Sequence, residues 1–297
     1  MSDAHYQLGD LAQAAEHARR AKNGFHEQIA GRLASPPANA RVVTVPVPFV
    51  RQHEMTCAPA TFSAISTYWN APVDHLGLAR RICYDGTPGH EERNWAEENG
   101  FTVREFRATW ETAVALLDRG VPFTLATVET SSAHLQAIVG YDGIRGTIFI
   151  RDPYLKHHSE AIGDKWIADY EFSGPRSMVF LPKSEAHRID GIELPDAPLY
   201  DLRFQIDRAL HRHDRPAAAA ALAALESQAP AHRMTLSARR DIASYDANQP
   251  ESLAATEALL ALFPECNNLR WACHHALCDH ARQIVYGDGL LSYVTAA

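Results

Sequence analysis

The first part of the chain carries apolar residues at helical spacing. Leucine and alanine recur three or four positions apart between residues 8 and 21, a pattern that predicts a helix with one apolar face. The segment 35–40, Ser-Pro-Pro-Ala-Asn-Ala, is rich in residues that break regular structure. We therefore predict an N-terminal helical segment over residues 1–38. Its Gly9-Asp10 step followed by an alanine-rich stretch also resembles one unit of a helical repeat.

Residues 39–190 alternate between helix and strand signals. Apolar residues alternate with Thr and Pro over 43–49, and the prolines confine such a strand to an edge or to strand ends. Helices are predicted over 61–69 and 111–119, and strands over 122–128, 135–141, 147–151 and 177–181. The dipeptide Asp142-Gly143 joins two of these strands and is a hairpin signal. Helices followed by hairpin-linked strands predict an α+β domain with an antiparallel sheet, not a doubly wound parallel one.

Residues 191–297 lose the strand signals and become rich in alanine, leucine and glutamate. Asp214-Arg-Pro recurs as Asn248-Gln-Pro, and Ala229-Pro230 recurs as Phe263-Pro264, both at an offset of 34 residues. This offset is the period of a tetratricopeptide helical hairpin. We predict an all-α domain of tetratricopeptide-like repeats over 191–297, with antiparallel helix pairs across about 199–285. A plain helical bundle is the alternative.

Composition excludes several classes of function. The 297 residues are 46% hydrophobic with a net charge of -8, and no Lys/Arg run interrupts that balance, which argues against a nucleic-acid partner. The N-terminus lacks the apolar core of a secretory signal, and the apolar stretches are too short for a membrane span. Five cysteines in a chain of this length fit reduced thiols. We expect a soluble cytoplasmic protein.

Cys57 is the candidate nucleophile. It stands just before Pro59 and an apolar helix, and proline is favoured in the first helical turn. A thiol at a helix N-terminus is favoured as the reactive thiolate by the helix dipole. The alternative for a lone cysteine is a small buried hydrophobic residue.

His134 and Asp152 are candidates for the base and its orienting carboxylate. His134 opens one predicted strand after a polar segment, and Asp152 follows the next strand. If the Asp142-Gly143 turn pairs the strands about a midpoint near 143, residue 134 lies opposite roughly residue 152. The hairpin then brings imidazole and carboxylate within hydrogen-bond reach. The alternatives are an ordinary exposed histidine and an aspartate that caps its own turn.

Gln52 is a candidate oxyanion donor, because it lies five residues before Cys57 and a side-chain amide can donate to a developing oxyanion. The alternative is a glutamine in a surface loop.

Together these motifs resemble the C39 peptidases. The series consists of Gln52, then Cys57-Ala-Pro-Ala-Thr, then His134-Leu-Gln-Ala-Ile-Val-Gly-Tyr, then Arg151-Asp-Pro. The C39 peptidases are papain-like cysteine peptidases related to the bacteriocin-processing domains of ABC exporters. The resemblance covers about residues 42–184, including the tail 166–182.

The resemblance implies a papain-like α+β fold in which Cys57 is the nucleophile and His134 the general base and acid. It implies that Asp152 orients the histidine and that Gln52 donates to the oxyanion. Three features depart from the family pattern. Ala58 stands where the family usually has Gly, Gln52 is one residue closer to the cysteine, and no exporter membrane domain follows. The first two bear on the oxyanion hole and the third on the substrate, since exporter-linked members cut leader peptides after a double glycine.

The expected function is therefore a C39-like cysteine peptidase acting on a peptide or protein, with leader-peptide processing as one candidate role. Its helical repeats are expected to bind substrate or a protein partner. Two alternatives stay open: an inactive peptide-binding scaffold, and an acyl transferase that uses the same Cys-His-Asp machinery.

No cofactor or metal is predicted. The Cys/His-rich stretch 266–280 lacks the paired spacing of a structural zinc site, so a zinc protein is a distant third reading. His90-Glu91-Glu92 lacks the second histidine of a metallopeptidase motif.

Overall fold

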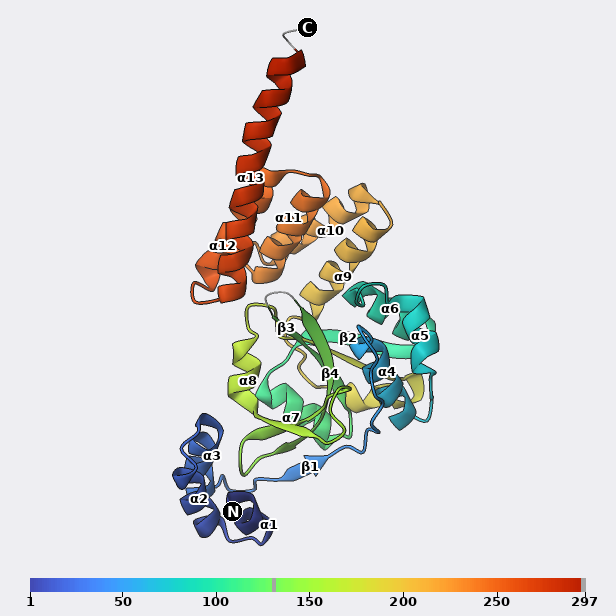
Figure 1. Cartoon of the computed structure of the whole chain (residues 1–297). Coiled ribbons are helices and arrows are strands. Elements are labelled where there is room, and N and C mark those ends of the chain that lie inside the picture. The colour runs from blue at the N-terminus through green and yellow to red at the C-terminus, as the bar shows by residue number, and fades with distance from the viewer. Residues whose placement is uncertain (130–131, 295–297) are drawn as a thin grey trace. The chain divides into compact units, whose positions relative to one another are not determined.

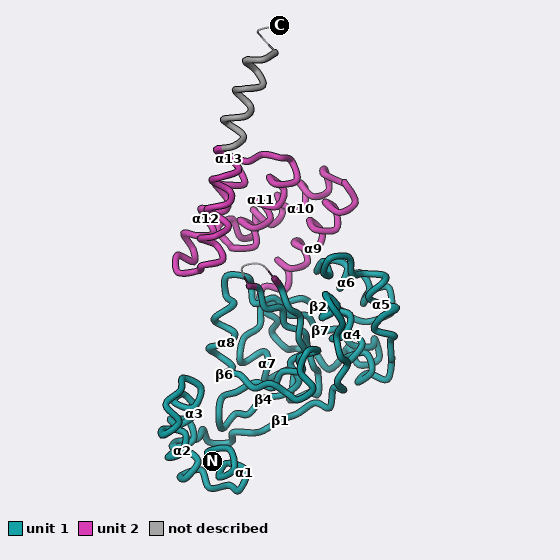
Figure 2. Tube along the Cα trace, viewed as in Figure 1, with its two compact units in different colours: residues 1–128, 133–195 teal, residues 129–132, 196–297 magenta. Residues whose placement is uncertain are grey.

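The computed structural model describes residues 1–129 and 132–294, with side chains up to residue 281 (Figure 1). The chain divides into two compact units (Figure 2). One holds residues 1–128 and 133–195, and the other holds 129–132 and 196–297. No helix in the described part of the chain is both long and apolar enough to cross a membrane.

The first unit is built on an antiparallel sheet. Its strands are β1 (Val42–Thr44), β2 (Phe101–Arg107), β3 (Phe123–Val128), β4 (Ala133–Asp142), β5 (Thr147–Arg151), β6 (Ser159–Ile162) and β7 (Arg176–Pro182). They follow the order β2-β7-β3-β4-β5-β6, and β1 also pairs with β4. Every pairing is antiparallel. The predicted α+β class with an antiparallel sheet is thus confirmed.

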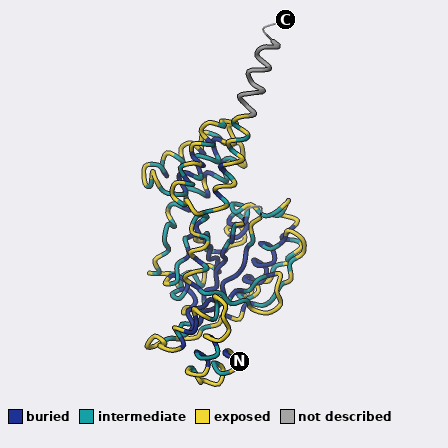
Figure 3. The backbone as a smooth tube through the Cα atoms, turned by 60° about the vertical axis from the view of Figure 1, so that its left-hand side comes forward, coloured by how far each residue is buried: buried dark blue, intermediate teal, exposed yellow. Residues whose placement is uncertain are grey.

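Helices surround this sheet. They are α4 (Cys57–Tyr68), α5 (His75–Ile82), α6 (Gly89–Glu98), α7 (Trp110–Asp118), α8 (Gly163–Asp169) and the 3-10 helix η1 (Lys183–Ile189). Helix α4 packs along β4, and its residues 58–66 are all buried (Figure 3). Phe62 stacks on Phe180 of β7 with ring centroids 4.6 Å apart and meets Trp95 of α6 edge-on. A helix buried this deeply fixes the position of its first residue, Cys57.

The predicted strand over 43–49 is shorter than its alternation suggests. Only Val42–Thr44 pairs as a strand, because Pro46 and Pro48 have no N–H to donate to a ladder. Val45 still donates its N–H to the carbonyl of Val139 at 2.7 Å, and both Val45 and Val47 are buried. The alternating pattern therefore indicates which residues are buried, and it extends beyond the residues that pair in the sheet.

Helix α6 and strand β2 were not predicted, because charged residues occupy their inner positions. Glu92 of α6 and Glu105 of β2 are both buried. Arg176 of β7 donates to the carboxylates of Glu92 at 2.7 Å and Glu105 at 2.6 Å, and to the Gly89 carbonyl at 3.1 Å. Arg93 of α6 also reaches Glu105, at 3.3 Å. This network of buried ion pairs joins α6 to β2 and β7, a role that apolar contacts ordinarily have in a protein core.

Replacing Arg176 by Met should destabilise the protein by about 3–5 kcal/mol, because two buried carboxylates would lose their shared partner. Urea denaturation would measure this loss. The matched control is Arg81→Met, which breaks the 2.6 Å ion pair between Arg81 and Glu98. The side chains of these two residues are 55% and 57% exposed. That change should cost no more than about 1 kcal/mol. Equal losses in the two variants would contradict a structural role for the buried network.

The N-terminal helices α1 (Ser2–Gln7), α2 (Leu11–Arg20) and α3 (Gly24–Ala34) belong to the first unit. Their small core, which includes Ala14, Ile29 and Leu33, also packs against Ile144 and Ile162 near β5 and β6. The Tyr6 hydroxyl donates to the buried Asp142 carboxylate at 2.6 Å. The helices thus cover the turn of the β4–β5 hairpin.

The second unit is helical in its described residues from 197 on. It contains α9 (Ala197–His211), α10 (Arg215–Gln228), α11 (Arg233–Tyr245), α12 (Gln249–Leu262) and α13 (Asn267–Val294), so the predicted absence of strands over 200–285 is confirmed. Asp214 and Asn248 cap α10 and α12 in the same way, each accepting from the N–H three residues on. The residues before them both have positive φ, 57° at His213 and 55° at Ala247.

The 34-residue offset in the sequence is thus an offset between equivalent turns. Pro230 and Pro264 follow the C-caps Ala229 and Phe263, which have similar backbone angles. The N-terminal Gly9-Asp10 step repeats the arrangement, since Gly9 also has positive φ and Asp10 accepts from Gln13 N–H at 3.0 Å. The assignment of these hairpins to the tetratricopeptide class stays a prediction, as do the three domain boundaries.

Candidate active site

Cys57 is the first residue of α4 and is partly buried. Thr56 precedes the helix, but its side chain does not cap the helix N–H groups. Its hydroxyl instead accepts from the N–H of His53 at 2.9 Å and lies 3.0 Å from Nε2 of His75 on α5. The uncapped N–H groups leave the positive end of the helix dipole directed at the thiol region.

His134 stands between Cys57 and Asp152. It is the second residue of β4, and its Nε2 lies 3.0 Å from Oδ1 of Asp152. The His134 side chain also hydrogen-bonds the Cys57 sulfur, as does the backbone N–H of Leu135. Because Nε2 faces the carboxylate, Nδ1 is the ring nitrogen left for the sulfur. The structure therefore brings together three of the four predicted site residues.

Asp152 lies just beyond the end of β5. The same Oδ1 that meets His134 also accepts from the Tyr154 N–H at 2.7 Å. This second bond fixes the carboxylate from its own loop, so that it faces the imidazole.

The hairpin register differs from the prediction by two residues. Asp142 pairs with Thr147, so the turn spans residues 143–146 and is not a two-residue Asp-Gly turn. A bulge between Ile138 and Gly140 shifts the register again, and Ala137 faces Arg151. By this register Asp152 lies opposite residue 136, two positions beyond His134. The Asp152 side chain reaches His134 across that offset.

The electrostatics of the three groups favour an ion pair. Burial acts to raise the pKa of the Cys57 thiol, but the hydrogen bonds from His134 and Leu135 and the histidine charge outweigh it and hold the pKa below its ordinary value. Burial acts to lower the pKa of His134, yet its bonds to Asp152 and Cys57 raise that pKa to about 9. The pKa of Asp152 is lowered, since His134 and the Tyr154 N–H outweigh the effect of burial. A thiolate beside an imidazolium is the nucleophilic form of such a site.

Residues 44–173 match the model of the Peptidase_C39 like family. These residues form a C39-like domain. The peptidase domain of Streptococcus ComA, described as a bifunctional ABC transporter involved in a quorum-sensing pathway, is a similar solved structure. It is 17% identical, the match covers 46% of this chain and 99% of that one, and the TM-score is 0.39. No curated protein gives a significant match to the chain.

Gln52 of the C39-like domain is anchored beside Asp152 through its backbone. Its N–H donates to the Pro153 carbonyl at 2.9 Å, directly after Asp152. Its side-chain Oε1 is buried and has no hydrogen-bond partner among the described residues. Since the two ends of an amide are assigned from their partners, an unpartnered buried end can equally be the N–H end that donates to a ligand.

The remaining cysteines of the chain lie in different surroundings. Cys83 donates its S–H to the Met55 carbonyl at 3.1 Å. Burial raises the pKa of the Cys273 thiol, followed in effect by the nearby Glu257 carboxylate. Cys278 lies 3.8 Å from His274, one turn earlier on the same helix. Cys57, by contrast, has its pKa lowered by His134 and the Leu135 N–H.

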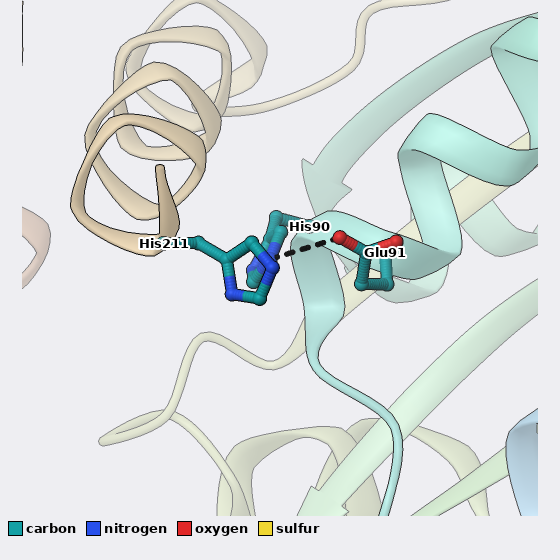
Figure 4. A group of neighbouring side chains, drawn as sticks. All are labelled: His90, Glu91 and His211. Carbon is teal, nitrogen blue, oxygen red and sulfur yellow. Dashed lines mark ion pairs between the residues drawn. The ribbon is translucent and has the colours of Figure 1, made fainter. Parts of the chain in front are cut away.

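His90 and Glu91, which the sequence does not arrange as a metallopeptidase motif, are neighbours at the start of α6. Their side chains form an ion pair of 3.3 Å, drawn as a dashed line in Figure 4.

Sequence reasoning missed one contributor to the site, the Leu135 N–H. Every residue except proline has a backbone N–H, so residue type does not show which N–H acts in a site. Only the packing of α4 against β4 identifies this one.

The C39-like domain should show a pH-dependent thiol. Cys57 should be alkylated by iodoacetamide faster than the other four cysteines at neutral pH, because its depressed pKa leaves more thiolate. The ion pair should form as pH rises through the lowered thiol pKa and should be lost as His134 deprotonates near pH 9. Peptide-resolved mass spectrometry over pH 5–10 would follow the formation of the thiolate as a rise in Cys57 labelling, with Cys83 as the internal control. Faster labelling of Cys83 or Cys266 would contradict the assignment.

Proposed function

We propose that this protein is a cytoplasmic cysteine peptidase in which Cys57, His134 and Asp152 form the catalytic triad. One observation supports the proposal above the others: a single imidazole hydrogen-bonds both a helix-N-terminal thiol and a carboxylate. The cytoplasmic setting rests on the five cysteines, all of which are free.

The reaction follows from these contacts. The Cys57 thiolate attacks the carbonyl carbon of the scissile peptide bond, and the carbonyl oxygen takes the negative charge. The His134 imidazolium then gives its proton to the leaving amine as the C–N bond breaks, which leaves a thioester on Cys57. Neutral His134 next takes a proton from water, whose hydroxide attacks the thioester. The acid product leaves, and the thiolate is restored. Asp152 stabilises the imidazolium in the resting state and orients the ring throughout.

The oxyanion needs at least one donor close to Cys57. The first N–H groups of α4 are suited to this, since no side chain caps them. The Gln52 amide is the second candidate, because its backbone is held beside Asp152 and one end of its side chain has no partner. Ala58 in place of glycine does not obstruct the helix start, where it is buried as part of α4.

Gln52→Ala should lower turnover by on the order of 10²–10³ with little change in substrate binding, as is typical when one oxyanion donor is removed. Steady-state kinetics on a cleaved peptide would separate kcat from KM. Gln136→Ala is a useful companion, because Gln136 is also a glutamine of this domain but its amide bonds Thr127, 3.4 Å away. Near wild-type kcat for Gln52→Ala would show that Gln52 is a loop residue and would leave the triad assignment intact.

The substrate class follows from the peptidase reading: a peptide or an extended protein segment, with leader-peptide processing as the specific form we favour. The helical unit would hold that substrate or a partner protein, since stacked helical hairpins offer long binding surfaces.

The test is a comparison of peptides in a cell lysate treated with wild-type protein or with Cys57→Ala. New N-termini that appear only with the wild type would identify cleavage sites and substrates. An identical set of N-termini from both proteins, over several lysates, would overturn the peptidase proposal and favour the inactive scaffold. Addition of hydroxylamine would trap the thioester on Cys57 as a hydroxamate and so test for the acyl-enzyme that hydrolysis and acyl transfer share.

A further inference from the structure

Helix α4 and strand β4 are joined by two hydrogen bonds at the same residue. The Leu135 N–H donates to the Cys57 sulfur, and the Leu135 carbonyl accepts from the Thr61 hydroxyl at 3.0 Å. Cys57 and Thr61 are four residues apart and lie on one face of α4. Residue 135 is thus held at both of its backbone polar groups by the helix that carries the nucleophile.

We propose that Thr61 is a positioning residue that holds the start of β4 against α4, so that His134 and the Leu135 N–H stay on the Cys57 sulfur. This inference rests on the proposed function only for its biological meaning, since the arrangement of the thiol can be measured without a substrate.

Burial makes the Thr61 contact specific. Thr61 is 2% exposed, so water cannot replace its hydroxyl as the partner of the Leu135 carbonyl. Strand β4 is also held from its other side, where the Thr127 hydroxyl donates to the His134 carbonyl at 3.3 Å. Thr127 thus holds the carbonyl of the peptide group whose N–H meets the sulfur, and Thr61 holds the carbonyl of the next peptide group. Loss of the shorter bond leaves an unpaired buried carbonyl, and this cost favours a shift of β4 away from α4.

The experiment compares Thr61→Val and Thr61→Ser in the full chain. Valine keeps the shape of threonine but has no hydroxyl, whereas serine keeps the hydroxyl. The readout is the pH midpoint of Cys57 alkylation by iodoacetamide, followed by peptide-resolved mass spectrometry. Thr61→Val should move that midpoint upward by about one pH unit, which is about tenfold less thiolate at neutral pH. Thr61→Ser should stay within a few tenths of a unit of wild type.

Thr67→Val is the matched control. Thr67 lies on the same helix, is exposed, and donates its hydroxyl to the Ser63 carbonyl at 2.7 Å within α4. Removing that bond should leave the Cys57 midpoint unchanged. Circular dichroism would verify that each variant is folded, and Thr61→Ala replaces Thr61→Val if the valine variant does not fold.

An unchanged midpoint in a folded Thr61→Val or Thr61→Ala protein would overturn the proposal. So would a Thr61→Ser protein that shifts as far as the valine variant, because the hydroxyl would then not be the group that matters. Peptidase activity plays no part in these measurements. A chain that cuts no peptide but shows the shift would therefore refute the proposed function and leave the role of Thr61 standing.

Discussion

His134→Gln is expected to lower peptide turnover by on the order of 10⁶, the loss seen when a hydrolase loses the histidine that activates its nucleophile. Glutamine can still hydrogen-bond Asp152, so the loop after β5 should keep its place. It cannot take up or release a proton, so the thiolate would lose its counter-charge and the leaving amine its proton donor.

Two measurements separate this loss from unfolding. The first is kcat/KM on a peptide that wild type cleaves and Cys57→Ala does not. The second is alkylation of Cys57, whose pH midpoint should rise toward the ordinary thiol value in His134→Gln. His187→Gln is the control, because His187 lies in η1 with its Nδ1 3.2 Å from the Ser184 carbonyl. Turnover within tenfold of wild type in His134→Gln would remove that residue from the triad.

Asp152→Asn is expected to lower turnover by on the order of 10⁴, as for the orienting carboxylate of serine peptidases. The asparagine oxygen can still accept from the Tyr154 N–H, so the loop geometry is retained. The carboxylate charge is lost, and with it the larger of the two influences that raise the pKa of His134 to about 9. The alkaline limit of activity should therefore move to lower pH.

A pH–rate profile of kcat/KM tests this. The Asp152→Asn profile should fall at a lower pH than the wild-type profile, in addition to its lower maximum. Asp164→Asn is a suitable control, since Asp164 pairs with Arg32 at 3.1 Å in an exposed ion pair near β6. A profile with the wild-type alkaline limit would show that Asp152 does not control the protonation of His134.

The sequence was sufficient to predict elements in which apolar and polar residues alternate with the period of a helix or a strand. Strand 147–151 was predicted with its observed bounds, and the hairpin at Asp142 was found because turn residues separate two apolar runs. The register was wrong by two residues, because the longer turn shifts the pairing by three residues and the bulge near Val139 takes one of them back. Neither feature leaves a clear signal in residue type.

What escaped prediction is the part of the fold in which charges replace apolar contacts. The pattern of α6 is that of a solvated segment, yet Glu92 and Arg93 are buried in ion pairs with partners 84 and 12 positions away in the chain, respectively. Such pairing depends on a tertiary arrangement that no local pattern encodes. In the candidate site, side-chain types predicted Cys57, His134 and Asp152, which the structure places together. The backbone donor at Leu135 and the Thr61 contact with the Leu135 carbonyl are seen only once α4 lies on β4.

The covered hairpin turn has a consequence for how the protein could be shortened. The β4–β5 hairpin carries His134 and Asp152 at its open end, and its turn lies under the N-terminal helices. Removing those helices would expose Ile144 and Ile162 and leave the Asp142 carboxylate without the Tyr6 hydroxyl. We therefore expect a fragment limited to residues 44–173 to hold the hairpin less firmly than the full chain, because helices α1–α3 stabilise the turn from which His134 and Asp152 extend.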